Sequence, residues 1–278
     1  MNFDLIAIDL DSTLLSGDGH VTPRTREALE RAHRAGAEIV ICTGRRFSSA
    51  MAVLDGITCA DHIVVNNGVV AKDIATTQTV YSNYFTVEDY SACISALKRL
   101  HPELPVLVMV DEHPDYEFCA DLVEGANDFH MQYVTNNAHM LRPVSTLETL
   151  PTGKIIQCCV LHEIEQLEAA EAPITGATAR HADCFIIRNV KYLGCSFEMV
   201  PRGASKWRAL QFLANSYSIP AQRIMAIGDD LNDLAMIQGA GLGVAMGNAV
   251  EAVRDAAGYV TADKDHDGVA EAMERYAF

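Results

Sequence analysis

The sequence predicts an α/β protein, with a parallel-sheet core into which an α+β unit is inserted. Two observations carry this prediction. Short apolar runs alternate with helical segments over the first eighty residues and again from about residue 192, whereas strand-like and helix-like segments mix irregularly between these stretches. Because strands that alternate with helices form parallel sheets with right-handed crossovers, the first and last parts of the chain are expected to share one core.

The first part predicts three buried strands separated by helices. Residues 3–9 form a short apolar run typical of a buried parallel strand, and residues 37–43 and 62–66 do the same. Thr22 and Pro23 are the expected N-cap and first-turn proline of a helix that ends at Gly36, and another helix is expected near residues 48–54.

The remaining elements define the predicted domains. In the middle, strands are expected at 104–110, 115–119, 154–161 and 183–188, and helices at 87–100 and 163–171. The last part alternates again, with strands at 223–228, 242–246 and 258–261 and helices at 204–217, 230–238, 249–257 and 268–276. We therefore predict a core of residues 1–82 and 191–278 and an inserted α+β domain of residues 83–190.

Composition narrows the range of partners and locations. Of 278 residues, 37 are acidic and 21 basic, which leaves a formal net charge of −16. This excess argues against nucleic acid and anionic membrane surfaces, because both attract basic patches. No apolar run approaches the roughly 18–20 residues that cross a bilayer, and the N-terminus lacks the features of a secretory signal. A cytoplasmic protein is expected.

The eight cysteines predict no metal or disulfide framework. No pair has Cys-x-x-Cys spacing, and the adjacent Cys158 and Cys159 would point to opposite faces of a strand. Buried free thiols are the expected state in a chain without an export signal.

Polar residues follow several predicted strands at their carboxyl ends, where open α/β sheets bind ligands. Near these ends lie Asp9, Asp11, Thr43, Gly44, Asp229, Asn232 and Asp233, with Lys206 at the start of a helix. Converging carboxylates repel one another, and a magnesium ion, which prefers oxygen ligands, relieves that repulsion. A carboxylate beside such an ion can attack phosphorus, and a second carboxylate two residues later can serve as general acid and base. A threonine hydroxyl and a lysine ammonium suit a transferring phosphoryl group.

The order of these motifs resembles the haloacid dehalogenase (HAD) superfamily, most closely its Cof-like phosphatase branch. The resemblance rests on four segments, which are Asp9–Leu14, Thr43–Arg45, Lys206 and Gly228–Met236. Residues 244–249 and 267–270 resemble further segments of that branch. The resemblance covers both core parts and implies a Rossmann-like HAD core, while residues 83–190 match the inserted cap domain by position and length, as the part that selects the substrate.

The resemblance implies a role for each motif residue. Asp9 would be the nucleophile that forms an aspartyl phosphate, and Asp11 the general acid and base. Magnesium would be held by Asp9, the backbone carbonyl of Asp11 and Asp229. The phosphoryl group or substrate would be bound by Thr43, Gly44, Lys206 and Asn232, with Asp233 orienting Lys206 or a metal-bound water. The predicted function is hydrolysis of a small phosphorylated metabolite such as a sugar phosphate, a nucleotide or a cofactor phosphate.

Three alternatives compete with this prediction. A phosphotransferase or phosphomutase of the same superfamily would pass the phosphoryl group to a sugar hydroxyl, and a non-catalytic module would bind metal and phosphate without turnover. Residues 263–274 fit the EF-hand spacing of a calcium-binding protein, but a strand rather than a helix is expected before them.

Two residues depart from the family pattern. Ser12 stands where glycine is usual, and its small size should still let the loop close. Trp207 follows Lys206 where a small residue is common, and either a packing role or a place at the pocket rim is open to it.

Overall fold

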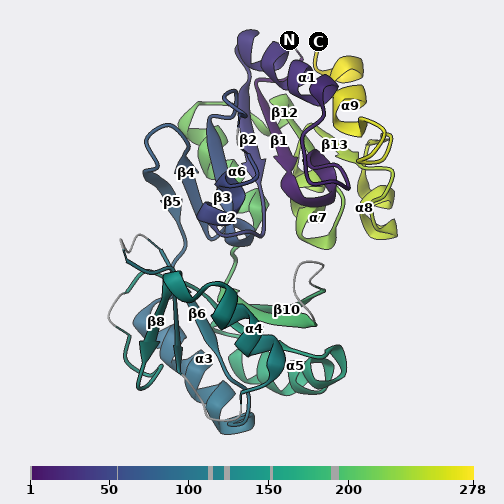
Figure 1. The fold of residues 1–278 in the computed structure, drawn as a ribbon. Coiled ribbons are helices and arrows are strands. Elements are labelled where there is room, and N and C mark those ends of the chain that lie inside the picture. The colour runs from purple at the N-terminus through teal and green to yellow at the C-terminus, as the bar shows by residue number, and fades with distance from the viewer. Residues whose placement is uncertain (1, 55, 112–114, 122–125, 151–152, 189–193) are drawn as a thin grey trace. The chain divides into compact units, whose positions relative to one another are not determined.

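The chain forms two compact units (Figure 1). The structure is a computed structural model that describes residues 2–54, 56–111, 115–121, 126–150, 153–188 and 194–278. The first unit comprises Met1–Ser82 and Ser205–Phe278, and the second comprises Asn83–Ala204.

An eight-stranded sheet organises the first unit, in the order β14-β13-β12-β1-β2-β3-β4-β5. Its strands are β1 (Leu5–Asp9), β2 (Glu38–Cys42), β3 (His62–Val65), β4 (Val70–Asp73), β5 (Thr79–Ser82), β12 (Ile224–Gly228), β13 (Leu242–Ala245) and β14 (Tyr259–Val260). The six strands from β14 to β3 run parallel, and their positions match the strands expected from the sequence. The β4–β5 hairpin, which the sequence did not reveal, extends the sheet antiparallel at one edge.

Helices cover both faces of this sheet. They are α1 (Pro23–Arg34), α2 (Phe47–Met51), α6 (Lys206–Ser216), α7 (Leu234–Gly239), α8 (Glu251–Ala256) and α9 (Gly268–Tyr276), with short helical turns η1 (Leu10–Leu14), η2 (Asn66–Gly68), η4 (Ala221–Arg223) and η5 (Leu231–Asp233). Crossovers lead from β1 toward β3 in one direction and from β12 toward β14 in the other, so right-handed connections place their helices on opposite faces. This is the predicted Rossmann-like core.

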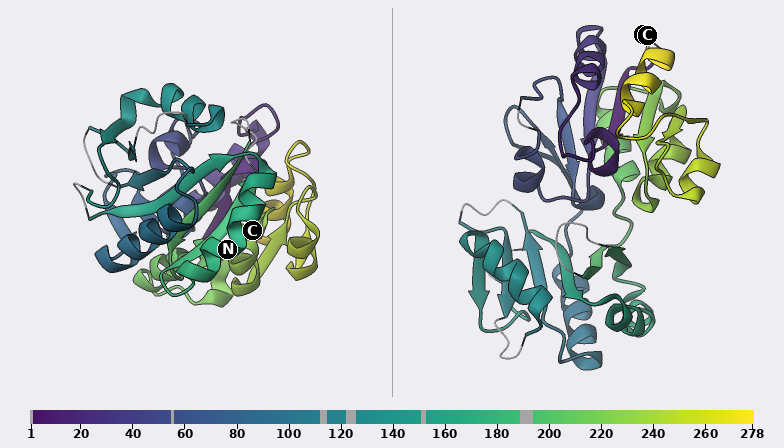
Figure 2. Two further views of the ribbon diagram at one scale, coloured as in Figure 1. Left: turned by 90° about the horizontal axis from the view of Figure 1, so that it is seen from below. Right: turned by 45° about the vertical axis from the view of Figure 1, so that its right-hand side comes forward.

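Local signals set the ends of α1. The hydroxyl of Thr22 accepts a hydrogen bond from the amide of Thr25 at 3.2 Å, as expected for an N-cap. The helix ends before Gly36, whose φ of +91° suits glycine. α1 lies beside α9, and the amide of Asn2 donates to the carbonyl of Ala277, so the two chain ends lie close together (Figure 2).

A six-stranded sheet in the order β10-β11-β9-β6-β7-β8 forms the second unit. Its strands are β6 (Leu107–Val110), β7 (Phe118–Asp121), β8 (Leu141–Val144), β9 (Ile155–His162), β10 (Ala182–Arg188) and β11 (Cys195–Pro201). Its helices are α3 (Val87–Leu100), α4 (Asp128–Asn136) and α5 (Ile164–Thr178), with a short turn η3 (Ala138–Met140). The sequence placed the end of this unit near residue 190. In the structure β11 pairs antiparallel with β9 and β10, and the compact unit therefore continues to Ala204.

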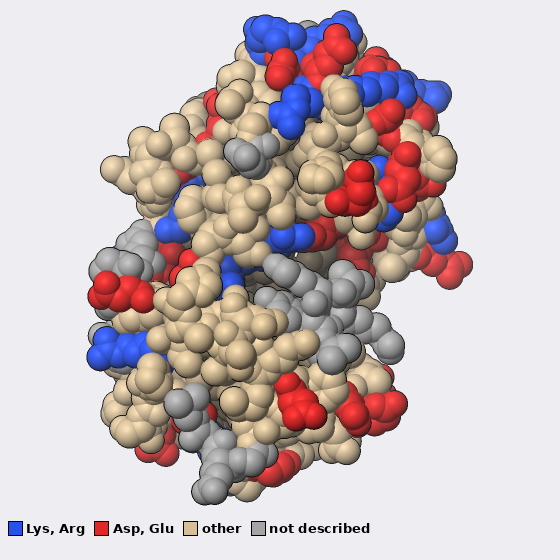
Figure 3. All heavy atoms as spheres, viewed as in Figure 1, with Lys and Arg blue, Asp and Glu red and all other residues tan. Residues whose placement is uncertain are grey.

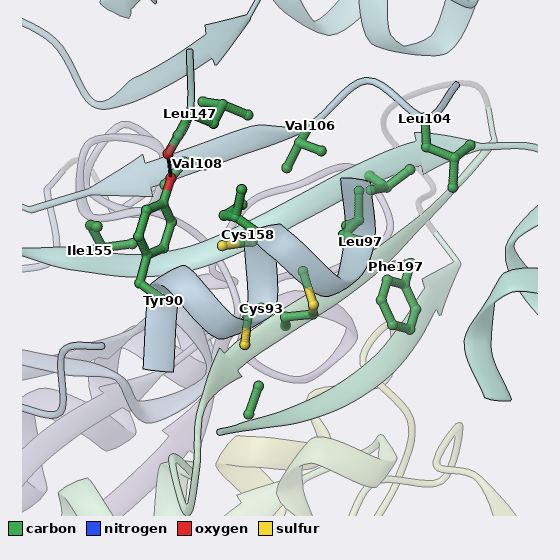
Figure 4. Packing of buried hydrophobic residues seen from close by; sticks show 14 of the residues in the cluster. Tyr90, Cys93, Leu97, Leu104, Val106, Val108, Leu147, Ile155, Cys158 and Phe197 are labelled. Carbon is green, nitrogen blue, oxygen red and sulfur yellow. Dashed lines mark hydrogen bonds between the residues drawn. The ribbon is translucent and has the colours of Figure 1, made fainter. Parts of the chain in front are cut away.

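The core of the second unit lies between its sheet and the adjacent helices α3 and α5 (Figure 4). Tyr90 of α3 spans this core, and its hydroxyl donates to the carbonyl of Leu147 at 2.5 Å. Cys158 belongs to the same cluster, whereas Cys159 does not, because successive strand residues point to opposite faces. All eight cysteines are free thiols, as predicted.

Within the described residues, none of the helices combines the length and apolar character needed to cross a membrane. In the face of the first unit seen in Figure 3, acidic and basic side chains mix where α1 and α9 lie and also near α8.

Candidate active site

The carboxyl ends of three neighbouring strands define the candidate site. β1 lies between β12 and β2, with Ile8 opposite Ile227 and Asp9 opposite Cys42. The residues that follow these strands therefore emerge side by side at one edge of the sheet. This register brings Asp9, Thr43 and Asp229 together, as the sequence predicted for the ends of parallel strands.

The turn after β1 is closed and held from two sides. The amide of Leu15 donates to the carbonyl of Leu10 at 3.0 Å, and Ser12 adopts a φ of +60°. This left-handed conformation favours glycine, which is why serine here is a departure that the loop still accommodates. The side-chain amide of Asn248 donates to the Ser12 carbonyl at 2.9 Å, and the Thr13 hydroxyl donates to Asp229 at 2.7 Å. The turn is thereby tied to the loops after β12 and β13.

Lys206 forms a buried ion-pair network at this edge. Its Nζ lies 2.6 Å from Oδ1 of Asp9 and 2.6 Å from Oδ1 of Asp233, and the lysine is only 1% exposed. Burial alone would lower the pKa of Lys206, but the two carboxylates outweigh it and hold the pKa above its usual value. The ammonium therefore stays charged between two carboxylates.

Asp233 reaches this network because residue 228 is glycine. Its second oxygen, Oδ2, accepts hydrogen bonds from the amides of Asp229 and Asp230 at 2.9 and 3.1 Å. A Cβ at Gly228 would lie 2.5 Å from Cγ of Asp233, so any side chain there would displace the carboxylate. With both oxygens engaged, Asp233 is placed to hold Lys206.

The cluster of carboxylates at this edge suits a divalent cation. One ligand atom from each of Asp9, Asp229 and Asp233 lies within 4.8 Å of the others. Burial, together with Asp233, raises the pKa of Asp9 well above its ordinary value, and burial raises the pKa of Asp229 to about 6 despite the hydrogen bond from Thr13. Among the described residues, the Lys206 ammonium pairs with Asp9 and Asp233 but not with Asp229, so the three carboxylates offer more hard oxygen donors than this cation engages. The donor set fits the divalent metal that the sequence predicted.

Thr43, Gly44 and Asn232 surround a second part of the site. The buried Thr43 accepts a hydrogen bond from the amide of Arg45 at 3.0 Å, which leaves its own hydroxyl hydrogen available. Asn232 donates to Oδ1 of Asn67 at 2.9 Å, and a Cβ at Gly44 would lie 3.0 Å from that same oxygen. Asn67 thus connects the loops that carry Gly44 and Asn232.

Asp11 lies apart from the carboxylate cluster. Its carboxylate forms a bidentate pair with Arg45, with Nε donating to Oδ2 at 2.8 Å and Nη2 to Oδ1 at 2.5 Å. The side chain of Asp11 is 50% exposed, in contrast with the buried Asp9. The structure therefore gives the two carboxylates of the Asp-x-Asp motif different partners.

Several residues that shape the site received no role from the sequence. Arg45 and Asn248 stand in quoted motifs, and Asn67 follows the strand expected at 62–66. Single polar residues in loops carry no signal of which side chain they contact. Trp207 lies against α7, where a Cβ at Gly239 would fall 2.2 Å from its indole ring. The tryptophan therefore packs between α6 and α7.

The acidic loop at residues 263–267 does not have EF-hand surroundings. The strand β14 precedes it, as expected, and Gly268 begins α9. Asp265 accepts a hydrogen bond from the amide of Gly17, and Asp267 accepts one from the Thr22 hydroxyl. Asp267 occupies the N-cap position of α9 but does not cap it with its side chain, because φ is +57° and the carboxylate is turned to Thr22.

Comparison with protein families agrees with this geometry. The model of the haloacid dehalogenase-like hydrolases matches residues 6–273, which is nearly the whole chain and both compact units. The chain belongs to this family. It is a phosphatase-type hydrolase with a Rossmann-like core, as its relatives also indicate.

Named relatives and solved structures extend over almost all of the hydrolase. It is 28% identical to 5-amino-6-(5-phospho-D-ribitylamino)uracil phosphatase YwtE of Bacillus subtilis, over 95% of each chain. It is also 28% identical to phosphatase YwpJ of the same organism, over 97% of this chain and 98% of the relative. A haloacid dehalogenase-like hydrolase from Bacteroides thetaiotaomicron has a similar structure, with a TM-score of 0.79 and 27% identity over 98% of this chain and 99% of that one.

Proposed function

We propose that this hydrolase is a Mg²⁺-dependent phosphatase that acts on a small phosphorylated metabolite through an aspartyl phosphate at Asp9. The observation that carries the proposal is the buried ion-pair network of Asp9, Lys206 and Asp233 beside Asp229. A phosphate-binding site without chemistry would have no need for a buried carboxylate oriented in this way.

Lys206 orients Asp9 for its attack on phosphorus. The ammonium holds Oδ1 at 2.6 Å, so Oδ2 is the oxygen available to form a bond to phosphorus. Asp233 in turn fixes the ammonium, which remains positively charged. The lysine therefore restrains the nucleophile and offers positive charge to the phosphoryl oxygens.

The phosphoryl group is bound by Thr43, Gly44, Lys206 and Asn232. The Thr43 hydroxyl already accepts a hydrogen bond from the backbone, so its hydrogen can be donated to a phosphoryl oxygen. The absence of a side chain at Gly44 makes room for Asn67, and the backbone amide of Gly44 is the group proposed to contact the ligand.

Asp9 and Asp229 would hold the magnesium ion, together with the backbone carbonyl of Asp11. The bound ion would neutralise charge on the carboxylates and on the phosphoryl group. Asp11 would give a proton to the leaving oxygen as the bond to Asp9 forms, and would accept a proton from the water that later attacks phosphorus.

The second unit, Asn83–Ala204, is proposed to act as the cap that selects the leaving group. YwtE is named as a phosphatase of a phosphoribitylamino-uracil. A substrate panel should therefore begin with that compound and continue through sugar phosphates, nucleotides, pyridoxal phosphate and flavin mononucleotide. The compounds of this panel share the phosphoryl group and differ in the leaving group, so the panel tests directly which leaving group the enzyme selects.

The first test measures phosphate release from p-nitrophenyl phosphate. Chelation by EDTA should abolish turnover, and Mg²⁺ should restore it. Asp9→Asn should lower kcat by at least about 10⁴-fold, because removal of a nucleophile eliminates the covalent route. Asp4→Asn, at the opposite end of β1, is the matched control and should retain activity. Turnover by Asp9→Asn would contradict the assignment of the nucleophile.

A second test traps the intermediate. Acid quench during turnover, followed by borohydride reduction and peptide mass spectrometry, should locate the acyl phosphate at Asp9 in the wild type alone. Modification at another carboxylate would reassign the nucleophile. Complete conversion of substrate in a single-turnover experiment, with no acyl phosphate trapped at any time point, would count against a covalent route.

A further inference from the structure

The pair between Arg45 and Asp11 is an interaction at the site that the proposed mechanism leaves unused. Two of the three guanidinium nitrogens donate to the two carboxylate oxygens, at 2.8 Å for Nε to Oδ2 and 2.5 Å for Nη2 to Oδ1, while Nη1 donates to the Ser49 carbonyl at 3.5 Å. This is fork-to-fork geometry, which fixes the plane of the carboxylate as well as its distance. The arginine is the more enclosed partner, with 22% of its side chain exposed against 50% for the aspartate.

The arginine itself is fixed through its backbone. Its amide donates to the Thr43 hydroxyl at 3.0 Å, and its carbonyl accepts from the amide of Asn66 at 3.0 Å. The Asp11 side chain, in contrast, projects from a turn in which the next residue, Ser12, has a φ of +60°. A half-exposed aspartate in such a turn would otherwise sample several rotamers, so Arg45 supplies the restraint that the turn does not.

We propose that Arg45 is a positioning residue that acts through Asp11, by holding the acid–base carboxylate in one orientation. The inference rests on the proposed function, in which Asp11 transfers protons. Arg45 itself exchanges no proton, because a guanidinium remains protonated in proteins.

The proton balance defines what Arg45 can affect. In the first step the Asp9 oxygen bonds to phosphorus and the bond from phosphorus to the leaving oxygen breaks. The proton carried by one oxygen of the Asp11 carboxyl group passes to the leaving oxygen, while the other Asp11 oxygen keeps its hydrogen bond from Arg45. In the second step a water oxygen bonds to phosphorus, the bond to Asp9 breaks, and a water proton returns to Asp11. A displaced Asp11 would therefore impair the departure of poor leaving groups and the activation of water.

Substrates with different leaving groups separate positioning from direct phosphate binding. The value of kcat/KM reports steps through formation of the aspartyl phosphate. Nitrophenolate leaves without protonation, whereas an alkoxide requires it. Loss of Arg45 should therefore lower kcat/KM for an alkyl phosphate and leave that for p-nitrophenyl phosphate nearly unchanged. A direct contact between Arg45 and the phosphoryl group would lower both alike.

The experiment is a double-mutant cycle of Arg45→Ala and Asp11→Asn, using p-nitrophenyl phosphate and the alkyl phosphate that the panel turns over best. Asp11→Asn should lower kcat/KM for the alkyl phosphate by about 10²–10⁴-fold, and Arg45→Ala by at least about 10-fold. Arg45→Ala should add less than about 3-fold in the Asp11→Asn background, because a residue that acts only through Asp11 has nothing left to position.

Controls separate this role from general destabilisation. Arg223→Ala breaks a bidentate pair with Asp4, which directly precedes β1 at the end opposite the site, and the distances of this pair are the same, 2.8 and 2.5 Å. This variant should leave kcat/KM unchanged for both substrates. Arg45→Lys retains the charge without the fork and should show the same selective loss, which keeps the test open if Arg45→Ala unfolds. Added guanidinium ion should partly rescue Arg45→Ala and not the double variant.

The outcomes distinguish the two proposals. Equal losses of kcat/KM for both substrates would overturn the positioning role, and so would additive effects of the two substitutions in the double variant. Either result would indicate that Arg45 contacts the substrate directly. Full alkyl phosphatase activity in Arg45→Ala with a defective Asp11→Asn would also overturn it. Unchanged hydrolysis of the alkyl phosphate by Asp11→Asn would refute the acid–base role in the proposed function and the inference about Arg45 with it. Loss of phosphate release in Asp9→Asn would still support the covalent route.

Discussion

The two units bury charge in opposite ways. In the first, the Lys206 ammonium lies between the carboxylates of Asp9 and Asp233, at 2.6 Å from each. In the second, the buried Glu198 of β11 has no such cation among its described partners; the Ser196 hydroxyl donates to it at 3.0 Å. Burial raises the pKa of Glu198 to about 7, although the hydrogen bond from Ser196 acts in the opposite direction.

The difference distinguishes a reactive group from a structural one. A buried carboxylate that faces an ammonium gains Coulombic stabilisation of its charged form, whereas one that faces neutral donors gains less and takes up a proton more readily. The first unit therefore keeps the Lys206 ammonium charged at the strand ends where phosphoryl chemistry is proposed, although burial also raises the pKa of Asp9. In the second unit no cation among the described partners of Glu198 opposes the effect of burial, and the pKa of this carboxyl rises to about 7.

The largest expected effect comes from removing the ammonium. Lys206→Met should lower the free energy of unfolding at pH 7 by about 3–5 kcal/mol, because it leaves buried carboxylates without their partner. Denaturant titration measures this. Lys98→Met in the second unit is the matched control, since the pair of Lys98 with Asp121 is part-exposed, at 27% and 17%, and should contribute about 1 kcal/mol or less. Equal losses in the two variants would remove the contrast between the units.

An intermediate effect is expected at Gly228. Alanine there would place a Cβ 2.5 Å from Cγ of Asp233, so Gly228→Ala should cost about 1–3 kcal/mol and reduce phosphatase activity by displacing the carboxylate that holds Lys206. The comparison is Gly176→Ala in α5, where nothing lies within 4 Å and alanine should stabilise the helix by about 0.5–1 kcal/mol. A neutral Gly228→Ala would show that the loop after β12 adjusts freely.

The smallest effect, taken over a single pH unit, is a pH dependence in the second unit. Unfolded glutamate titrates near 4.5 and folded Glu198 near 7, so the native state binds the proton more tightly between these values. Stability should then fall as pH rises through this window, by up to about 1.4 kcal/mol per pH unit. Glu198→Gln should remove this fall in denaturant titrations from pH 4.5 to 7.5, while the exposed Glu165→Gln should not. Parallel curves for wild type and Glu198→Gln would refute the neutral state.

Periodicity and strand-end motifs were sufficient to predict the parallel core and to bring Asp9, Thr43 and Asp229 to one edge. These features depend on local pattern and on the topology of parallel sheets. The partner of Asp11 could not be predicted in this way, because a pair with Arg45 depends on rotamers across two loops. Nor could the role of Asp233 be decided between Lys206 and a metal-bound water until its contacts were known.

Elements of the second unit were missed for a different reason. β11 carries the polar Ser196 and Glu198 on one face, so its apolar pattern is interrupted, and it is stabilised by pairing with distant strands. α5 was expected to end near residue 171, but it continues past Pro173 to Thr178. The proline is exposed, and the buried residues Ala170 and Ile174 keep the helical stripe intact across it. Tertiary packing thus outweighed the local signal.

The pairing of β1 with β12 has a consequence for biosynthesis. The edge of β1 that pairs with β12 stays without its partner until Ile224 to Ile227 have been synthesised. At about 5–20 residues per second, the ribosome needs roughly 10–40 s to extend the chain from Asp9 to Ile224. All strands of the second unit are synthesised within that interval, since β11 ends at Pro201. The inserted second unit can therefore fold while β1, the central strand of the first unit, still lacks its partner β12. The phosphatase site is then assembled last.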